Sequence, residues 1–256
     1  MSRFVNLELG GEAESLPEKL LAKDEPFYFG EAQSAFEQGR FEPALRHFSK
    51  VLEFNPRNAA AWTAQVRMLI ELTEYREAKL WADQALDRFP HEPELLAAKA
   101  VALGRSGALQ EAIAFSDASI EERGDTPYIW LARGDVLLAR QERRADYCFE
   151  KVLHLAPHDW SAHWMAGRIR CFYQQFVLAL SSLQKAMELN ATNYMVWLEL
   201  GRCQRSLGMV GPARASLQQA QQLDPNRREA ELELVELSET GVWGVVRGWG
   251  RRLVKP

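Results

Sequence analysis

The chain has 256 residues and a formal net charge of −4, with 47% hydrophobic and 26% charged residues, which is ordinary usage for a globular protein. The mild charge does not indicate a nucleic-acid binder, and the absence of any run of about 18 consecutive apolar residues argues against a transmembrane helix. The three cysteines, Cys148, Cys171 and Cys203, are odd in number and far apart, which argues against a disulfide framework and favours a cytoplasmic location.

Residues 1–24 come before any regular pattern, and we expect an N-terminal arm that is partly disordered or holds a short helix. Their sequence contains no apolar stretch typical of a secretory signal peptide. Ser15 is placed to cap a short helix with the sequence LPEKLLAK.

From residue 25 to residue 227, small residues recur every 34 positions, with a single step of 33. One series consists of Ala44, Ala78, Ala112, Ala145, Ala179 and Ala213, and a second of Ala32, Val66, Ala100, Gly134, Gly167 and Gly201. A third series, at the expected end of a helix, consists of Pro56, Pro90, Gly124, Pro157, Ala191 and Pro225. The three series share the short step, which places a one-residue deletion between Gly134 and Ala145.

Each unit of this repeat predicts two amphipathic helices joined by a short turn. In the first unit the helices cover about residues 27–38 and 41–54, Gly39 suits a turn with positive φ, and Pro56 ends the second helix. The small residues allow the two helices to approach closely. We expect the space beside them to be filled by large residues at Phe41, Tyr75, Leu109, Phe176 and Val210.

This pattern resembles the tetratricopeptide repeat family, whose repeat is a helix–turn–helix with an early aromatic, a small residue in each helix, a turn glycine and a closing proline. The resemblance implies an all-α fold, a right-handed helical-repeat solenoid of about six units. The units cover residues 25–58, 59–92, 93–126, 127–159, 160–193 and 194–227. An acidic stretch at residues 228–240 then predicts a capping helix, because a terminal repeat needs a polar outer face.

The resemblance further implies a non-catalytic scaffold or adaptor that binds a peptide or helix of a partner protein along a concave wall formed by the first helix of each unit. Carrying the family's wall positions over to this sequence gives the candidate groove residues Phe36, Arg67, Tyr128, Leu131, Asp135, Trp164, Arg168, Phe172, Leu198, Arg202 and Arg205. The same wall positions in the first two units include Phe29, Gln33 and Thr63.

Aromatic and arginine side chains dominate binding hot spots, so we expect a partner segment with apolar and acidic residues, centred on the last three units. The alternative is that the aromatic residues pack against the next unit and the arginines are solvated. Replacing Trp164 with alanine and Arg168 with glutamate is expected to abolish partner capture and to leave the melting curve unchanged.

Residues 241–256 form a basic tail with four arginine or lysine residues and no acidic residue, whereas the remainder holds 27 basic and 35 acidic residues. Candidate contact residues in the tail are Trp243, Arg247, Trp249, Arg251 and Arg252. Such a segment can dock on this chain, on a partner or neighbouring subunit, or on an anionic membrane surface. The alternative function is therefore a membrane-peripheral or self-associating assembly factor, with a possible homo-oligomer.

The sequence offers no candidate for catalysis, a metal or a cofactor. His154, His158 and His163 form the one histidine cluster, but Pro157 interrupts the helix between them, which favours turn and surface positions. Motifs for phosphate loops, dinucleotide binding, serine nucleophiles and zinc proteases are missing. We therefore expect no enzyme, no cofactor and no nucleic-acid partner.

Overall fold

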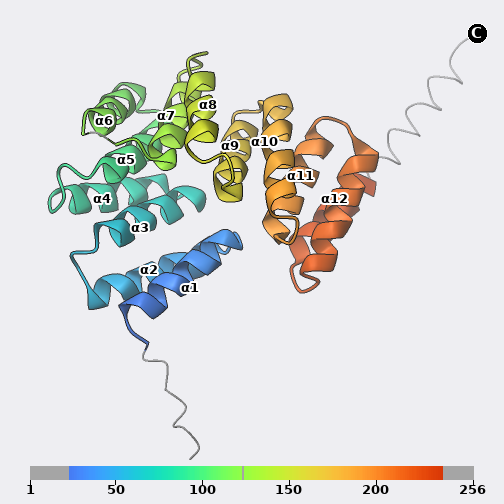
Figure 1. Ribbon diagram of the computed structural model, residues 1–256, viewed down its shortest axis with the longest axis horizontal. Coiled ribbons are helices and arrows are strands. Elements are labelled where there is room, and N and C mark those ends of the chain that lie inside the picture. Colours follow the sequence, from blue (N-terminus) through green and yellow to red (C-terminus); the bar gives the residue numbers. More distant parts are fainter. Residues whose placement is uncertain (1–22, 123, 239–256) are drawn as a thin grey trace, which may run out of the picture.

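The computed structural model describes residues 23–122 and 124–238, and these residues form helices and connecting turns without a strand. The helices follow one another in antiparallel pairs along a curved path (Figure 1). The pairs are α1 (Glu25–Glu37) with α2 (Phe41–Phe54), α3 (Ala59–Glu71) with α4 (Tyr75–Leu86), α5 (Pro93–Arg105) with α6 (Leu109–Glu121), α7 (Pro127–Ala139) with α8 (Ala145–Leu155), α9 (Trp160–Phe172) with α10 (Phe176–Leu189), and α11 (Tyr194–Ser206) with α12 (Val210–Leu223). Residues 228–238 are also helical. The predicted all-α helical-repeat fold is confirmed.

The two helices of a pair begin in different ways. Most first helices begin at a side-chain cap: Asn58 accepts a hydrogen bond from the backbone N–H of Ala61 at 2.9 Å, and Asp24, Thr126, Asp159 and Asn193 cap their helices similarly. Each second helix follows a residue with positive φ. That residue is glycine in three turns, Gly39, Gly107 and Gly208, and Thr73, Gln141 or Gln174 in the others.

The start of α8 shows where the deleted residue belongs. The other second helices begin two residues after the residue with positive φ, whereas α8 begins at Ala145, four residues after Gln141. The intervening turn is held by the Glu142 carboxylate, which accepts hydrogen bonds from the guanidinium groups of Arg140 and Arg144. The deletion therefore lies in this turn, and α8 begins at the repeat alanine Ala145, whereas the other second helices begin three residues before theirs.

Close approach within a pair depends on the glycines of the first helices. A Cβ atom at Gly167 would lie 2.6 Å from Cγ of Leu183, and one at Gly201 would lie 2.7 Å from Cγ of Leu217. The space beside these glycines is thus filled from the middle of the second helix. This corrects the expectation that residues at its start, such as Phe176 and Val210, would fill that space; Val210 is exposed.

We expect Gly167→Ala to lower the free energy of unfolding by about 1–3 kcal/mol, because the added methyl group overpacks a buried contact. Gly104 is the matched control: it lies in α5, and a Cβ atom there would be 3.6 Å from its nearest neighbour, an ordinary contact. Gly104→Ala should therefore raise stability by up to about 1 kcal/mol through helix propensity. Urea denaturation of both variants measures the difference; equal stabilities would contradict this packing account.

In three of the first helices, the side chain at the same repeat position contacts a backbone carbonyl oxygen in the turn that precedes the helix. The indole N–H of Trp62 donates to the carbonyl oxygen of Pro56 at 3.0 Å, and that of Trp197 donates to Ala191 at 2.7 Å. The buried ring of His163 occupies the same position, with Nε2 at 3.2 Å from the carbonyl oxygen of Pro157. This histidine therefore joins consecutive pairs from a buried position, which corrects the expectation of a turn or surface position for it.

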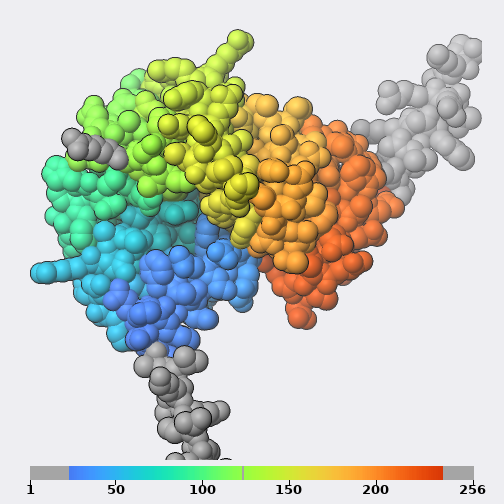
Figure 2. All heavy atoms as spheres, viewed as in Figure 1, coloured from blue at the N-terminus to red at the C-terminus, as the bar shows by residue number. Residues whose placement is uncertain are grey.

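The superhelix curves so tightly that its first pair contacts its last two. The amide of Asn193 donates to the carbonyl oxygen of Glu37 at 2.9 Å, and Arg227 donates to that of Gln38 at 2.5 Å. A Cβ atom at Gly39, between α1 and α2, would lie 2.5 Å from Sδ of Met195. Figure 2 shows the blue first pair lying against the yellow and orange pairs that follow residue 160. The inner wall therefore encloses a cavity instead of lining an open groove.

Candidate functional site

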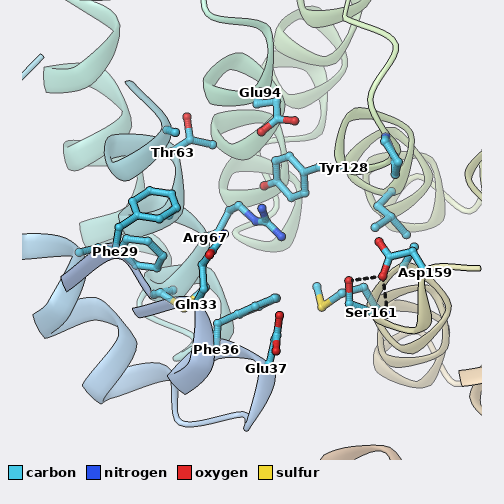
Figure 3. A pocket seen from close by; sticks show the side chains of 18 residues that line it. Phe29, Gln33, Phe36, Glu37, Thr63, Arg67, Glu94, Tyr128, Asp159 and Ser161 are labelled. Carbon is cyan, nitrogen blue, oxygen red and sulfur yellow. Dashed lines mark hydrogen bonds between the residues drawn. The ribbon is translucent and has the colours of Figure 1, made fainter. Parts of the chain in front are cut away.

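The central cavity has a volume of about 360 Å³ and is lined by the first helices of five pairs, α1, α3, α5, α7 and α9, together with Phe48 of α2. Its side chains converge from opposite walls (Figure 3). The lining includes Phe29, Gln33, Phe36, Glu37, Thr63, Ala64, Arg67, Glu94, Tyr128, Leu131, Asp159, Ser161, Ala162 and Met165. This mixture of apolar surface and a few polar groups is typical of a binding cavity.

Arg67 lies at the inner end of this cavity, between two aromatic rings. Its guanidinium carbon is 4.0 Å from the ring centroid of Tyr128 and 5.4 Å from that of Phe36. Within residues 23–122 and 124–238 its guanidinium group forms no ion pair and no hydrogen bond. Burial raises the pKa of the Tyr128 hydroxyl, although the positive charge of Arg67 opposes that rise. Tyr128 therefore stays neutral at physiological pH and offers a neutral face to the cation.

Behind Arg67 the cavity narrows to a neck of about 20 Å³, shared by Arg67, Tyr128 and Asp135. Asp135 is fully buried and accepts hydrogen bonds from Arg105 at 2.6 Å and from the Tyr173 hydroxyl at 2.7 Å. Burial disfavours the charged form of Arg105, but the carboxylates of Asp135 and Glu71 outweigh that effect and raise its pKa. The predicted groove residue Asp135 is thus part of a buried ion pair.

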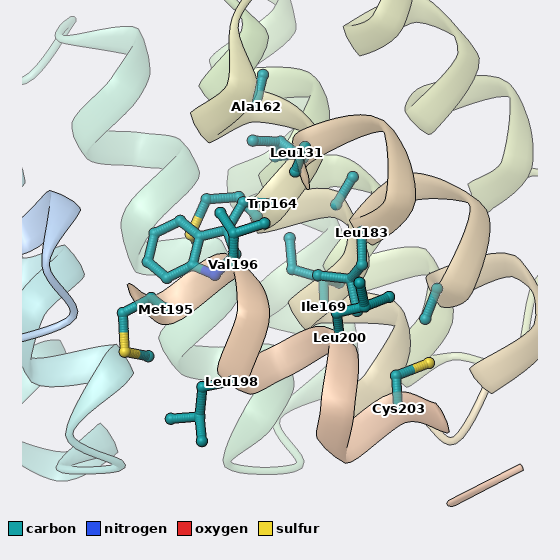
Figure 4. Close-up of a cluster of buried hydrophobic side chains, with 14 of the residues drawn as sticks. Leu131, Ala162, Trp164, Ile169, Leu183, Met195, Val196, Leu198, Leu200 and Cys203 are labelled. Carbon is teal, nitrogen blue, oxygen red and sulfur yellow. The ribbon is translucent and has the colours of Figure 1, made fainter. Parts of the chain in front are cut away.

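Trp164 and Arg168, the two residues on which the groove prediction depended most, form the contact between the first pair and the fifth. Trp164 is 0% exposed, packs edge-on against Phe36 at 5.8 Å between ring centroids, and belongs to the large core cluster shown in Figure 4. Arg168 lies over the ring of Phe41 at 4.8 Å, with Nη1 at 2.8 Å from a carboxylate oxygen of Glu71. The structure corrects the expectation that Trp164 lines an accessible wall, whereas Arg168 is partly buried and lines a smaller opening beside Phe172.

The candidate residues of α11 lie against the helix over residues 228–238. Arg202 donates to Glu233 at 2.7 Å, and Arg205 pairs with Glu233 at 2.9 Å and with Glu236. Leu198 is buried in the core. Leu198 is therefore covered and the two arginines, although partly exposed, are already paired with carboxylates of the chain, so the last pair is a weaker candidate for the site.

Of the predicted groove residues, Phe36, Arg67, Tyr128 and Leu131 line the cavity. Phe172 is exposed and lies at a smaller opening of about 110 Å³ on the other side of the neck. The prediction omitted Glu37, Glu94 and Asp159, which lie at or next to helix ends, and Met165, which lies in the middle of α9; none of these positions gives a sequence signal for a site. Only the curvature of the superhelix brings them to the cavity.

Two other expectations concern the tail and a metal site. The tail residues Trp243, Arg247, Trp249, Arg251 and Arg252 lie outside the described residues, so the membrane and self-association alternatives stay predictions. Across the described part of the chain, no helix is long and apolar enough to cross a membrane, and no group of three or more potential metal ligands comes together.

Comparisons with known proteins agree with this architecture. Two models of the tetratricopeptide repeat match residues 35–102 and 196–227. No protein of curated function matches the sequence significantly.

Solved structures show the same fold at low sequence identity. A tetratricopeptide repeat protein from Parabacteroides merdae has 14% identity and a TM-score of 0.55, with 86% of this chain and 87% of that chain covered. A thermophilic tetratricopeptide repeat protein from Thermus thermophilus has 16% identity and a TM-score of 0.51, with 83% and 98% covered. A chain of the APC/C hetero-tetramer Cut9–Hcn1 has 16% identity and a TM-score of 0.51; the match covers 88% of this chain but only 51% of that one. These structures show the shared fold; the two family models, together with the period of 34 residues and the observed helix pairs, identify the chain as a member of the tetratricopeptide repeat family.

Proposed function

We propose that this chain is a non-catalytic scaffold that receives a short segment of a partner protein in its central cavity. Tetratricopeptide repeat proteins bind protein partners in general, and the family is generally non-catalytic. The observation that carries the proposal is one cavity lined by the first helices of five pairs, with aromatic walls and an arginine that has no carboxylate partner among the described residues.

The size and lining of the cavity support a short segment over a long helix. A volume of about 360 Å³ lies at the lower end of the range for binding cavities, about 300–1,000 Å³. Phe29, Phe36 and Met165 offer apolar contacts, and Arg67 offers a positive charge. As in the sequence analysis, we propose a partner segment with apolar and acidic residues. Its binding site is centred on the first five pairs, however, and not on the last three units. A cytoplasmic location belongs to the same proposal, supported by three free cysteines.

We expect Ala64→Trp to abolish capture of a protein partner, because an indole ring at this position of α3 fills the cavity. Ala114→Trp is the matched control, since Ala114 is an exposed residue of α6 and does not line the cavity. The measurement is quantitative affinity capture from native lysate with the wild-type chain and both variants, after circular dichroism has established that each variant folds. Equal recovery of the same partner by Ala64→Trp and Ala114→Trp would exclude the cavity as the binding site.

A further inference from the structure

The stacking of the fifth and sixth pairs brings two cysteines together that are far apart in the sequence. Cys171 lies near the end of α9, and Cys203 lies in α11, the first helix of the next pair. Their thiols form a hydrogen bond with each other. Cys171 also packs against the core cluster that contains Cys203 (Figure 4). The reduced chain therefore holds a facing pair of thiols that no short cysteine motif predicts.

The two thiols of this pair differ in their access to solvent. Cys203 is 1% exposed, and its thiol donates a hydrogen bond to the carbonyl oxygen of Phe176 at 3.3 Å. Cys171 is half-buried, so a small molecule from solution can reach its sulfur atom. Cys171 is thus placed to meet an oxidant first, with Cys203 behind it as the second thiol, which is the usual arrangement of a redox-sensitive pair.

The hydrogen bond between the thiols also makes the pair more reactive than an isolated buried cysteine. It lowers the pKa of Cys203, because Cys171 donates to the Cys203 thiolate, and it raises the pKa of Cys171. The charge of Arg168 favours a thiolate at Cys171, whereas that of Glu199 opposes it. Burial raises the pKa of Cys148 to about 11. The pair therefore loses its first proton more readily than Cys148, and the thiolate is the nucleophile in disulfide exchange.

We propose that Cys171 and Cys203 are a reversible oxidation site, at which a small disulfide such as oxidised glutathione converts the two thiols into a disulfide between α9 and α11. Disulfides in a reducing compartment are usually transient and often sense the redox state. The inference does not depend on what the central cavity binds, so it stands or falls separately from the proposed function.

The exchange proceeds in two steps that balance. The Cys171 thiolate, formed as its proton passes to Cys203, attacks one sulfur of oxidised glutathione, which gives a mixed disulfide and releases one glutathione thiolate. Cys203 then attacks the Cys171 sulfur, forms the internal disulfide and displaces the second glutathione. Two protein thiols are oxidised, one glutathione disulfide is reduced, and the protons of the two protein thiols are taken up by the two released glutathiones.

This disulfide would join the two helices that hold the first pair in place. Trp164 of α9 packs against Phe36, and Asn193, the cap of α11, donates to the carbonyl oxygen of Glu37. A covalent link between α9 and α11 fixes the spacing of these two contacts. Oxidation should therefore stabilise the closed superhelix.

The test oxidises the full, fully reduced chain with oxidised glutathione in the absence of denaturant. Mass spectrometry should show the loss of two hydrogen atoms, and dithiothreitol should restore the original mass. Trypsin cuts after Arg170 and Arg202, so a non-reducing digest should contain peptide 171–185 linked to peptide 203–205. The oxidised chain should melt about 5 °C or more above the reduced chain, as expected for a bond that closes a loop of the unfolded chain.

Cys171→Ser and Cys203→Ala should each abolish the linked peptide, whereas Cys148→Ser, the matched control, should form it like the wild type. The digest of the wild-type chain needs no variant, so a folding defect in Cys203→Ala leaves the test intact. A lasting glutathione adduct at Cys171 without the link, a link to Cys148, oxidation only in denaturant, or a melting temperature that does not rise on linking would each overturn the inference.

Discussion

Replacing Arg168 with methionine is expected to lower the free energy of unfolding by about 3–5 kcal/mol and to separate the fifth helix pair from the first two. Nη1 of Arg168 lies 2.8 Å from Glu71, in an ion pair without hydrogen-bond geometry, and the Glu71 side chain is only 8% exposed. Glu199 also faces Arg168, at 3.6 Å, but keeps Arg202 as a partner at 3.5 Å. Glu71 is therefore the buried carboxylate that loses its ion-pair partner, although the charge of Arg105 still acts on it.

Urea denaturation measures the loss, and small-angle X-ray scattering should show an increased radius of gyration as the contact opens. Adding Glu71→Leu to Arg168→Met should recover most of the stability, because removing both charges costs much less than removing one. Arg205→Met is a milder control, since Arg205 is 30% exposed at the edge of the last pair. A loss below about 1 kcal/mol in Arg168→Met would show that this ion pair does not hold the superhelix closed.

This result bears on how binding variants are interpreted. Replacing Trp164 and Arg168 together was expected, from the sequence, to leave the melting curve unchanged. Since Trp164 is fully buried and Arg168 neutralises Glu71, that double variant should melt at a markedly lower temperature. Loss of partner capture in it would then report unfolding as well as binding, and Ala64 and Arg67 are the better positions for a test.

The second large loss of stability is expected on replacing Asp135. Asp135→Leu should lower the free energy of unfolding by about 3–5 kcal/mol, because it leaves the Arg105 guanidinium without its carboxylate. The Arg105 side chain is only 8% exposed, so water cannot replace that partner. The Tyr173 hydroxyl loses its acceptor in the same variant. The pair joins α5 to α7, and Tyr173 follows α9, so the loss should loosen three consecutive pairs at the neck of the cavity.

Urea denaturation measures the free energy of unfolding of Asp135→Leu. The control is the double variant that combines Arg105→Leu with Asp135→Leu. The double variant should approach wild-type stability, since well-packed apolar residues often replace a buried ion pair without loss. If Asp135→Leu and the double variant are destabilised equally, the cost comes from packing and not from an unpaired buried charge.

The sequence by itself determined the helix pairs of this protein. Their signals are local: polar caps such as Asn58, turn residues such as Gly39, and small residues such as Gly167 act within one repeat unit, so each can be recognised from a few neighbouring positions. The wall positions at Phe36 and Arg67 were also predictable, because they recur with the same period.

The tertiary structure alone decided which wall positions remain accessible. Curvature in a helical-repeat protein is the sum of small rotations between neighbouring units, and a slight difference in each decides whether the first unit meets the fifth. Here it does: Asn193 bonds to Glu37 across 156 positions of the chain, and Trp164 becomes core. Arg67 has the same residue type and repeat position as Arg168 and Arg202. It differs from them because none of the described carboxylates lies within ion-pair distance of it.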